Sequence, residues 1–152
     1  MAALTFRPAR DSDLPAIVDL LADDALGSGR EDPSRPLNAA YLDAFRAIDA
    51  DPNQLLVVAE ESSRLVGCLQ LSLLPGLSRL GAWRGQIESV RIATSERGKG
   101  YGRMLFEWAI DECRRRGCRL VQLTSDKSRS EALGFYRSLG FTPSHEGLKL
   151  EL

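Results

Sequence analysis

The chain has 152 residues, of which 43% are hydrophobic and 27% charged, and this balance predicts one compact domain over residues 1–152. The 20 basic and 21 acidic residues leave a net charge of -1, so no long-range field favours nucleic acid or an anionic membrane as a partner. No apolar run approaches the roughly 18 residues of a membrane span, and residues 1–10 lack the apolar core of a signal peptide, so we expect a cytoplasmic protein.

The first half of the chain predicts a strand, two helices and two further strands. Residues 4–7 alternate as a short strand, and Ser12 is placed to cap the helix that follows. The apolar residues of that helix recur at i, i+3, i+4 and i+7 and form one buried face: Leu14, Ile17, Val18 and Leu21. Residues 27–37 mix glycine, proline and charge, which indicates an exposed loop. A second helix around residues 41–48, an apolar strand at 55–59, a turn at 60–64 and a strand at 65–74 complete this half.

The second half begins with a connection at residues 75–85 and a strand at 86–92. A period of two divides that strand into two faces, with Glu88, Val90 and Ile92 on one and Ile87, Ser89 and Arg91 on the other. A long helix then ends near residue 116, because glycine, here Gly117, is the type favoured just after a helix. A strand at 118–124, a helix at 129–139 and one or two closing strands in 141–152 follow. The order βααβββαβαβ(β) predicts a mixed sheet with helices on both faces.

The cysteines and the single histidine form no recognisable metal site. Cys68, Cys113 and Cys118 are odd in number, and their spacing to His145 matches no set of zinc ligands. We therefore expect reduced thiols and no metal. For His145, a surface or strand position is favoured over contact with a substrate.

A glycine-rich segment, residues 97–102 (RGKGYG), stands between a predicted strand and the long helix. Three glycines in five residues allow the backbone to turn several N–H groups toward one point. Those groups, the positive end of the helix dipole and the cations of Arg97 and Lys99 together suit a diphosphate. A plain glycine-rich turn is the alternative, but a helix start needs one cap rather than three glycines and two cations.

Two other phosphate-binding loops do not fit this segment. A dinucleotide fingerprint that begins at Gly98 needs glycine at position 103, where Arg103 stands. A P-loop needs serine or threonine after its lysine, whereas Lys99 is followed by Gly100. The spacing therefore favours a different pyrophosphate-bearing cofactor.

Two motifs resemble those of one known family. The RGKGYG stretch, which follows Val90, Arg91 and Ile92, resembles the R/Q-x-x-G-x-G/A signature of the GNAT superfamily of acyl-CoA-dependent N-acetyltransferases. Residues 135–141 (FYRSLGF) look like the F-Y-x-x-L-G-F segment of that family, and the element order agrees over residues 4–152. The resemblance implies an α/β (α+β) fold with a mixed, mostly antiparallel sheet of six or seven strands and about four helices.

The resemblance also implies a co-substrate, acetyl-CoA, and the residues that hold it. In such proteins the signature amides hold the CoA diphosphate, and the preceding strand pairs with the pantetheine arm. A backbone N–H there, that of Val90, is implied to polarise the thioester carbonyl. The residues expected to bind acetyl-CoA are Val90, Arg91, Ile92, Arg97, Gly98, Lys99, Gly100, Tyr101, Gly102, Arg103 and Arg129.

Two side chains are candidates for proton transfer. A primary ammonium must lose a proton before it attacks, and Glu88, where many family members place a glutamate, is expected to accept it directly or through water. Tyr136 matches the family position of the acid that protonates the departing thiolate. A surface glutamate and a core aromatic are the respective alternatives. Arg129 stands where many members carry an asparagine that contacts pantetheine. Two interpretations of Arg129 remain: it pairs with a CoA phosphate or an acidic group of the acceptor, or it lies solvated at a helix start.

Together these features predict an N-acetyltransferase that moves the acetyl group of acetyl-CoA to a primary amine within a ternary complex. The closing segment, in which Ser144 and His145 follow the FYRSLGF motif, somewhat resembles aminoalkylphosphonate and other small-amine acetyltransferases of the family. A small-molecule acceptor is therefore favoured. A protein lysine or N-terminal acetyltransferase and a non-catalytic acyl-CoA sensor are the alternatives, and the family makes a homodimer an expectation.

Overall fold

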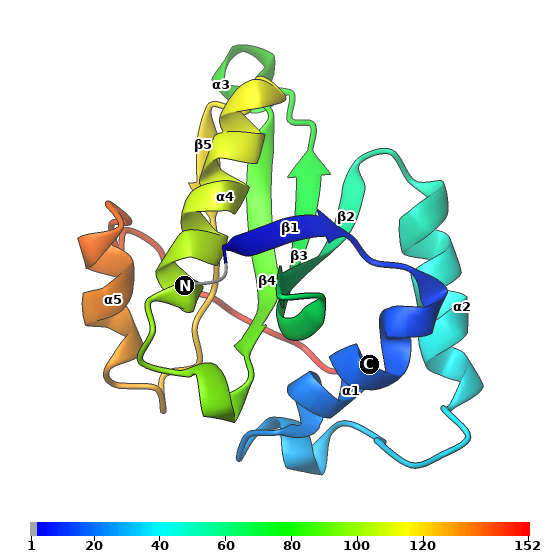
Figure 1. The fold of residues 1–152 in the computed structure, drawn as a ribbon. Coiled ribbons are helices and arrows are strands. Elements are labelled where there is room, and N and C mark those ends of the chain that lie inside the picture. The colour runs from blue at the N-terminus through cyan, green and yellow to red at the C-terminus, as the bar shows by residue number, and fades with distance from the viewer. Residues whose placement is uncertain (1–2) are drawn as a thin grey trace.

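The structure, a computed structural model, describes residues 3–152 and is built on one five-stranded sheet. Its strands are β1 (Leu4–Pro8), β2 (Gln54–Glu61), β3 (Arg64–Leu74), β4 (Arg84–Ile92) and β5 (Leu120–Gln122). They lie in this order across the sheet, antiparallel from β1 to β4, with β5 parallel to β4. This arrangement confirms the predicted mixed, mostly antiparallel sheet (Figure 1).

Helices cover both faces of the sheet (Figure 1). α1 (Leu14–Ala22) and α2 (Ala39–Ala50) pack on one face, whereas α4 (Tyr101–Arg115) and α5 (Ala132–Ser138) pack on the other. α3 (Ser78–Gly81) is a short turn in the β3–β4 connection, where Arg79 and Leu80 have left-handed φ angles of 56° and 60°. Short 3-10 turns span Asp11–Asp13, Gly27–Gly29 and Thr94–Glu96.

Two apolar clusters, one on each face of the sheet, form the core. On β3, Leu69 and Leu71 face α4 and share a cluster with Leu105, and all three are fully buried. Cys68 faces the other way and joins Ile17 of α1 in the second cluster. The central strands are therefore covered on both faces, as the apolar run at 55–59 predicts.

The close approach of α4 to β4 requires a glycine at position 85. A Cβ atom there would lie 2.2 Å from the Sγ of Cys113, so no larger residue fits. Cys113 and Cys68 are each 1% exposed, and burial raises the pKa of both thiols to about 12. Both cysteines are free thiols within the core.

The start of α1 differs from the prediction. The helix begins at Leu14, and Ser12 lies in the preceding 3-10 turn without capping it. The carboxylate of Asp13 closes that turn instead, because it accepts hydrogen bonds from the Arg10 amide at 2.7 Å and the Arg7 guanidinium at 2.8 Å.

The structure confirms the predicted hairpin turn and contradicts the predicted closing strands. The turn predicted at 60–64 is confirmed, since Ser62 and Ser63 both have left-handed φ angles, of 51° and 62°. In the described residues, however, the sheet has five strands where six or seven were predicted. β5 spans three residues instead of 118–124. Residues 141–152 form no strand, because their backbone makes no hydrogen bond with any strand among the described residues.

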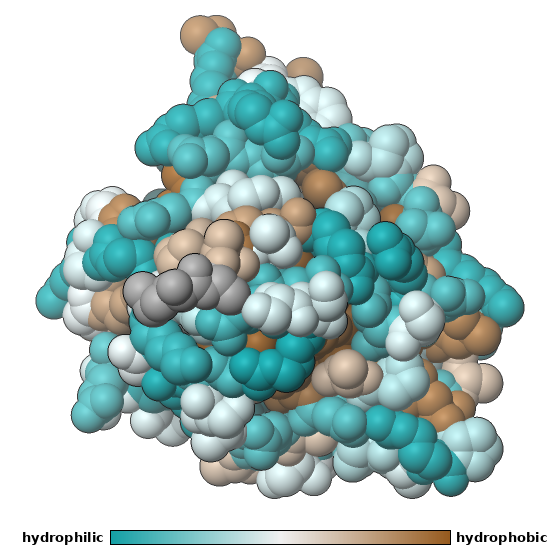
Figure 2. All heavy atoms as spheres, viewed as in Figure 1, coloured by the Kyte–Doolittle hydropathy of each residue, from teal (hydrophilic) through white to brown (hydrophobic). Residues whose placement is uncertain are grey.

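Within residues 3–152, no helix is both long and apolar enough to cross a membrane. Figure 2 shows that the face carrying β1 and α4 is mostly hydrophilic, with apolar atoms scattered among polar ones. Scattered apolar atoms of this kind are normal on a protein surface.

Candidate active site

A bulge in β4 sets the direction of the candidate catalytic side chains. Glu88 lies opposite Gln70 and Arg91 lies opposite Cys68, so two residues of β4 stand against one residue of β3. Ser89, the first of the two, has a left-handed φ of 55°. The period-two prediction is therefore wrong beyond Glu88, because one extra residue reverses the alternation.

The bulge separates Glu88 from Val90. Ile87, Val90 and Ile92 all belong to the apolar cluster under α4, whereas Glu88 shares the opposite face with Gln70. The sequence prediction placed Glu88 and Val90 on one face. In the structure, the carboxylate and the Val90 side chain point to opposite sides of the sheet.

β4 and β5 pair over only three residues, and the edge of β4 beyond them is open. The register joins Arg84–Gln86 to Leu120–Gln122, and no residue of β5 lies opposite 87–92. The Val90 carbonyl accepts a hydrogen bond from the Arg91 guanidinium at 2.9 Å. An open strand edge of this kind is where an extended, amide-bearing ligand pairs with the backbone.

The glycine-rich segment, here called the anion loop (residues 96–103), has the backbone that an anion site needs. Gly98 and Gly100 both have a φ of 82°, a left-handed conformation that residues with a side chain rarely adopt. Gly100 is the residue before α4, and no side chain caps the helix. The first N–H groups of α4 are therefore free of intrahelical partners and point out of the helix at its positive end.

A buried carboxylate holds this loop in place. Glu96 is 3% exposed and pairs with Lys99 of the loop and with Arg64 of the β2–β3 hairpin, the latter at 2.6 Å. Hydrogen bonds from Lys99 and then Arg64 lower the pKa of Glu96 to about 2. The same hairpin supplies Glu61, which accepts a hydrogen bond from the Tyr101 hydroxyl. The loop is thus fixed to the hairpin at both ends.

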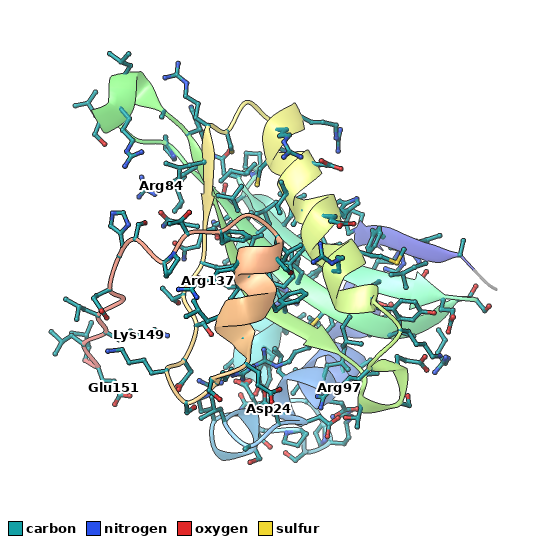
Figure 3. The ribbon with its side chains drawn as sticks, turned by 90° about the vertical axis from the view of Figure 1, so that its left-hand side faces the viewer. Asp24, Arg84, Arg97, Arg137, Lys149 and Glu151 are labelled. Carbon is teal, nitrogen blue, oxygen red and sulfur yellow. The ribbon has the colours of Figure 1, made fainter. Side chains whose placement is uncertain are left out.

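The predicted cations of the loop differ in what they contact. Lys99 is committed to Glu96, and Arg103 bridges to Ser138 of α5 at 2.6 Å. Arg97 is exposed, and among residues 3–152 its side chain has no ion-pair or hydrogen-bond partner. Figure 3 shows it on the turn before α4, at the same end of the molecule as Asp24. Arg97 is therefore the loop cation most available to a diphosphate.

Arg91 and Arg129, both expected near the cofactor, meet at Asp24. Its Oδ2 atom lies 3.3 Å from Nε of Arg91 and 3.0 Å from the Arg129 guanidinium. Burial alone would raise the pKa of Asp24, but the amide of Gly27 and the two arginines outweigh it, so the pKa lies below its usual value. Asp24 thus ties the end of α1 to β4 and to the segment before α5.

Glu88 ends a row of polar side chains that crosses two strands, here called the polar row (Gln122, Gln86 and Glu88). Gln122 donates from Nε2 to Oε1 of Gln86 at 2.9 Å, and Gln86 donates in turn to Oε1 of Glu88. Glu88 is exposed, so its second oxygen faces solvent on the side of the sheet that carries α1. The row orients a carboxylate that remains accessible to a ligand.

Tyr136 lies on the opposite side of the sheet from Glu88. Its ring packs edge-on against Phe106 with centroids 5.6 Å apart, and it also contacts Phe135 and Phe141. Among the described residues the hydroxyl has no hydrogen-bond partner. The ring is therefore part of the core packing, as the alternative interpretation held, while the hydroxyl is free to donate.

Several side chains that organise this region were not predicted from the sequence. Glu96 stands three residues before Lys99, an ion-pair spacing that the sequence shows, but its burial does not follow from that spacing. Asp24 offers no local signal, because its partner Arg129 is 105 residues away. Gln86 and Gln122 become neighbours only through the parallel register of β4 and β5.

Comparison with known proteins places this fold and loop in one family. A sequence model described as "Acetyltransferase (GNAT) family" matches residues 14–141. The chain therefore belongs to the GNAT family of acetyltransferases, and it is an acetyl-CoA-dependent N-acetyltransferase.

Curated relatives carry acetyltransferase names. The chain is 31% identical over 106 residues to an aminoalkylphosphonate N-acetyltransferase of Salmonella typhimurium, covering 70% of this chain and 68% of that protein. It is 33% identical over 93 residues to a glucosamine 6-phosphate N-acetyltransferase of Trypanosoma brucei brucei, covering 61% of each chain. Among solved structures, a chain described as a transcriptional regulator from Bacillus halodurans C-125 superposes with a TM-score of 0.96 at 46% identity. That superposition covers 99% of this chain and 100% of the other.

Proposed function

We propose that this protein transfers the acetyl group of acetyl-CoA to the primary amine of a small molecule, by direct transfer in a ternary complex. The observation that carries the proposal is the anion loop beside the open edge of β4. Free N–H groups at the start of α4, left-handed glycines and the exposed Arg97 suit a diphosphate, and the adjacent strand edge suits an amide-bearing arm. Two buried thiols suit a reducing compartment, so we also propose a cytoplasmic location.

Acetyl-CoA supplies an activated thioester, and the residues of the chain supply positioning and proton transfer. The Val90 N–H is proposed to donate to the thioester carbonyl oxygen, where negative charge develops as nitrogen attacks. Glu88 takes a proton from the incoming ammonium directly or through one water, and Tyr136 gives a proton to the sulfur as the C–S bond breaks. The nitrogen loses its second proton through water, which restores the Tyr136 hydroxyl, and Glu88 releases its proton to solvent. Because Glu88 and Tyr136 lie on opposite sides of the sheet, base and acid approach the thioester from opposite directions.

The acceptor is proposed to be a small amine that carries polar groups. Two relatives are named for acceptors of this kind, an aminoalkylphosphonate and an amino sugar phosphate. In this chain, the polar row places two amide side chains beside the proposed base. Amide groups hydrogen-bond hydroxyls and phosphoryl oxygens alike, so the row suits either acceptor.

The test is the rate of CoA thiol release from acetyl-CoA with a panel of aminoalkylphosphonates, amino sugar phosphates, aminoglycosides, polyamines, amino acids and lysine peptides. Acceleration by a small amine is the expected result. Acceleration only by the peptides would replace the small-molecule proposal with a protein acetyltransferase.

The alternative that the sequence left open is a non-catalytic acyl-CoA sensor, and one solved relative is described as a transcriptional regulator. The family match favours the transferase. Thermal unfolding with acetyl-CoA separates the two candidates from a failure of both. Acetyl-CoA that raises the Tm while no acceptor accelerates thiol release supports the sensor. An unchanged Tm at saturating acetyl-CoA contradicts both.

A further inference from the structure

The face of β4 that carries the proposed base also carries a cation, Arg84. The pairing of β3 with β4 is regular from Arg84 to Glu88, because the bulge begins only at Ser89. Alternate residues of a regular strand point to the same face, so Arg84, Gln86 and Glu88 lie in line on the side of the sheet that carries α1. β4 therefore presents a cation and a carboxylate on one face, with an amide between them.

The guanidinium of Arg84 is committed to no group of the protein. The side chain is half-buried, yet among residues 3–152 it takes part in no ion pair and no hydrogen bond. Its Nη1 atom lies 3.3 Å from the position that a Cβ atom of Gly76 would take, and the Ala82 carbonyl oxygen lies 3.0 Å from the same position. The guanidinium is therefore level with Ala82, on the side of Arg84 away from Glu88. A half-buried cation without a carboxylate partner suits an anionic ligand.

Arg84 and the anion loop are too far apart to serve one cofactor group. Figure 3 shows Arg84 near the α3 turn and Arg97 on the turn before α4, at opposite ends of the molecule. β4, which runs from Arg84 to Ile92, alone spans roughly 26 Å between them. A diphosphate bound at the anion loop does not reach Arg84, so an anion at Arg84 belongs to the other substrate.

We propose, on the basis of the function proposed above, that Arg84 binds an anionic group of the acceptor while Glu88 takes the proton from its amine. The acceptor class that fits both contacts is an amino sugar whose phosphate is remote from its amine. Between the two ends, Gln122 donates to Gln86 and keeps its own Oε1 atom free of partners among residues 3–152. A free carbonyl oxygen accepts a hydrogen bond from a sugar hydroxyl.

The separation of the two charged ends selects this class. Four residues of strand place the backbones of Arg84 and Glu88 about 13 Å apart, and the guanidinium lies further away still, beside Gly76. Contacts of about 3 Å at each end leave at least roughly 7 Å between the amine nitrogen and the nearest anionic oxygen. A pyranose ring with a phosphate on its exocyclic carbon spans such a gap. One or two carbons between nitrogen and phosphorus do not.

The first test compares three acceptors by CoA thiol release: glucosamine 6-phosphate, glucosamine 1-phosphate and glucosamine. The two phosphates carry the same groups and differ only in the distance between amine and phosphate. We expect kcat/KM for the 6-phosphate to exceed that for the other two by about ten- to a hundredfold, the factor that a hydrogen bond to a charged group supplies. Aminoethylphosphonate, which is also too short, should not exceed glucosamine.

The second test removes the cation. Arg84→Gln should raise KM for glucosamine 6-phosphate by about ten- to a hundredfold, with kcat near that of the wild type. KM for glucosamine and for acetyl-CoA should not change, because neither places an anion at Arg84. The matched control is Arg119→Gln, since Arg119 is exposed and its amide donates to the Trp83 carbonyl, next to Arg84. An equal rise in KM in both variants would show a diffuse positive field in place of a contact and overturn the proposal.

A binding measurement distinguishes failure of this inference from failure of the proposed function. Calorimetric titration of glucosamine 6-phosphate into protein saturated with CoA gives a Kd without turnover, and Arg84→Gln should weaken that Kd by the same factor. Small amines that accelerate thiol release, with no advantage of the 6-phosphate over the 1-phosphate or glucosamine, overturn the inference and leave the proposed function standing. Binding that depends on Arg84 while no amine accelerates thiol release overturns the transferase and keeps the anion site. Absence of both overturns both.

Discussion

The two sides of the candidate site are built from different parts of the polypeptide. On the cofactor side, the anion loop offers backbone N–H groups, and its shape depends on two left-handed glycines and a buried ion-pair network. On the acceptor side, the polar row offers side chains that come from two strands and meet only in the folded sheet. A site made of backbone N–H groups needs particular residues at a fixed local spacing. A site made of side chains from separate strands needs only the fold that brings them together.

This difference separates the residues that define the family from those that would select the acceptor. The diphosphate site that we propose at main-chain groups would constrain the sequence to a short motif, and the family model that matches residues 14–141 spans that motif. The acceptor site that we propose at Gln86, Gln122 and the exposed loops would constrain no contiguous stretch of sequence. Substitutions on the two sides should therefore change different kinetic constants.

The largest effect is expected on the acceptor side, from Glu88→Gln. Loss of a general base typically lowers turnover by about 10²–10⁴-fold, so kcat should fall by at least about a hundredfold. Binding of acetyl-CoA, followed as its effect on Tm, should not change. The control is Asp111→Asn, which removes an exposed carboxylate near the far end of α4. A kcat within twofold of the wild type would remove Glu88 from the mechanism.

On the cofactor side, Gly100→Ala should act on acetyl-CoA alone. An alanine at a φ of 82° costs roughly 1–2 kcal/mol and tilts the N–H groups of the loop, which corresponds to about a tenfold rise in KM for acetyl-CoA. Gly117→Ala is the matched control, because Gly117 has a φ of 81° at the other end of α4. It should lower the Tm similarly and leave KM unchanged. Equal KM changes in both variants would show that strain anywhere in α4 suffices.

Tyr136→Phe should reduce kcat by about tenfold, less than Glu88→Gln, because a thiolate is already a tolerable leaving group. The ring packing against Phe106 survives, so the Tm and its response to acetyl-CoA should match those of the wild type. Tyr41→Phe, which removes a hydroxyl bonded to the Asp32 amide, is the control. An unchanged kcat would leave Tyr136 as a packing residue only.

The smallest effect is expected from Glu96→Gln, on stability. The pKa of Glu96 is lowered from 4.5 to about 2 in the folded protein, so its ion pairs stabilise the fold fully above pH 4.5. That stabilisation is lost as the pH falls toward 2. The Tm of the variant should therefore lie several degrees below the wild type at pH 7, with the gap narrowing by pH 3. Glu107→Gln, which breaks an exposed pair with Arg103, should shift the Tm little at either pH. A gap of constant size would show that the charge of Glu96 does not cause it.

The sequence predicted those parts of the structure that depend on local rules. The buried face of α1, the hairpin at Ser62 and Ser63 and the loop before α4 all follow from spacing and residue type. The predictions failed where the local structure depends on a partner that is distant in the sequence. The bulge at Ser89 has no glycine or proline to mark it, and it reversed the expected direction of Val90 relative to Glu88. One or two closing strands were predicted in 141–152, but the residues of a segment cannot say whether a free sheet edge lies within reach.

In the candidate site, too, the locally determined parts were predicted and the parts that depend on distant partners were not. The predicted loop residues 97–103 form one continuous structure, and Arg91 and Arg129 meet at Asp24, a residue that the sequence did not indicate. The catalytic roles of Glu88 and Tyr136 are not tested by the structure, which shows an exposed carboxylate at Glu88 and, among residues 3–152, no hydrogen-bond partner for the Tyr136 hydroxyl. Their roles stay predictions until the variants above are measured.

The packing of Cys113 over Gly85 has a practical consequence for the assay. A thiol whose pKa is about 12 is almost entirely protonated near neutral pH, and only the thiolate attacks an aromatic disulfide dye. Cys68 is masked in the same way. The dye signal therefore counts the coenzyme released, and Cys118 is the one protein thiol among residues 3–152 that a blank without acetyl-CoA must correct for.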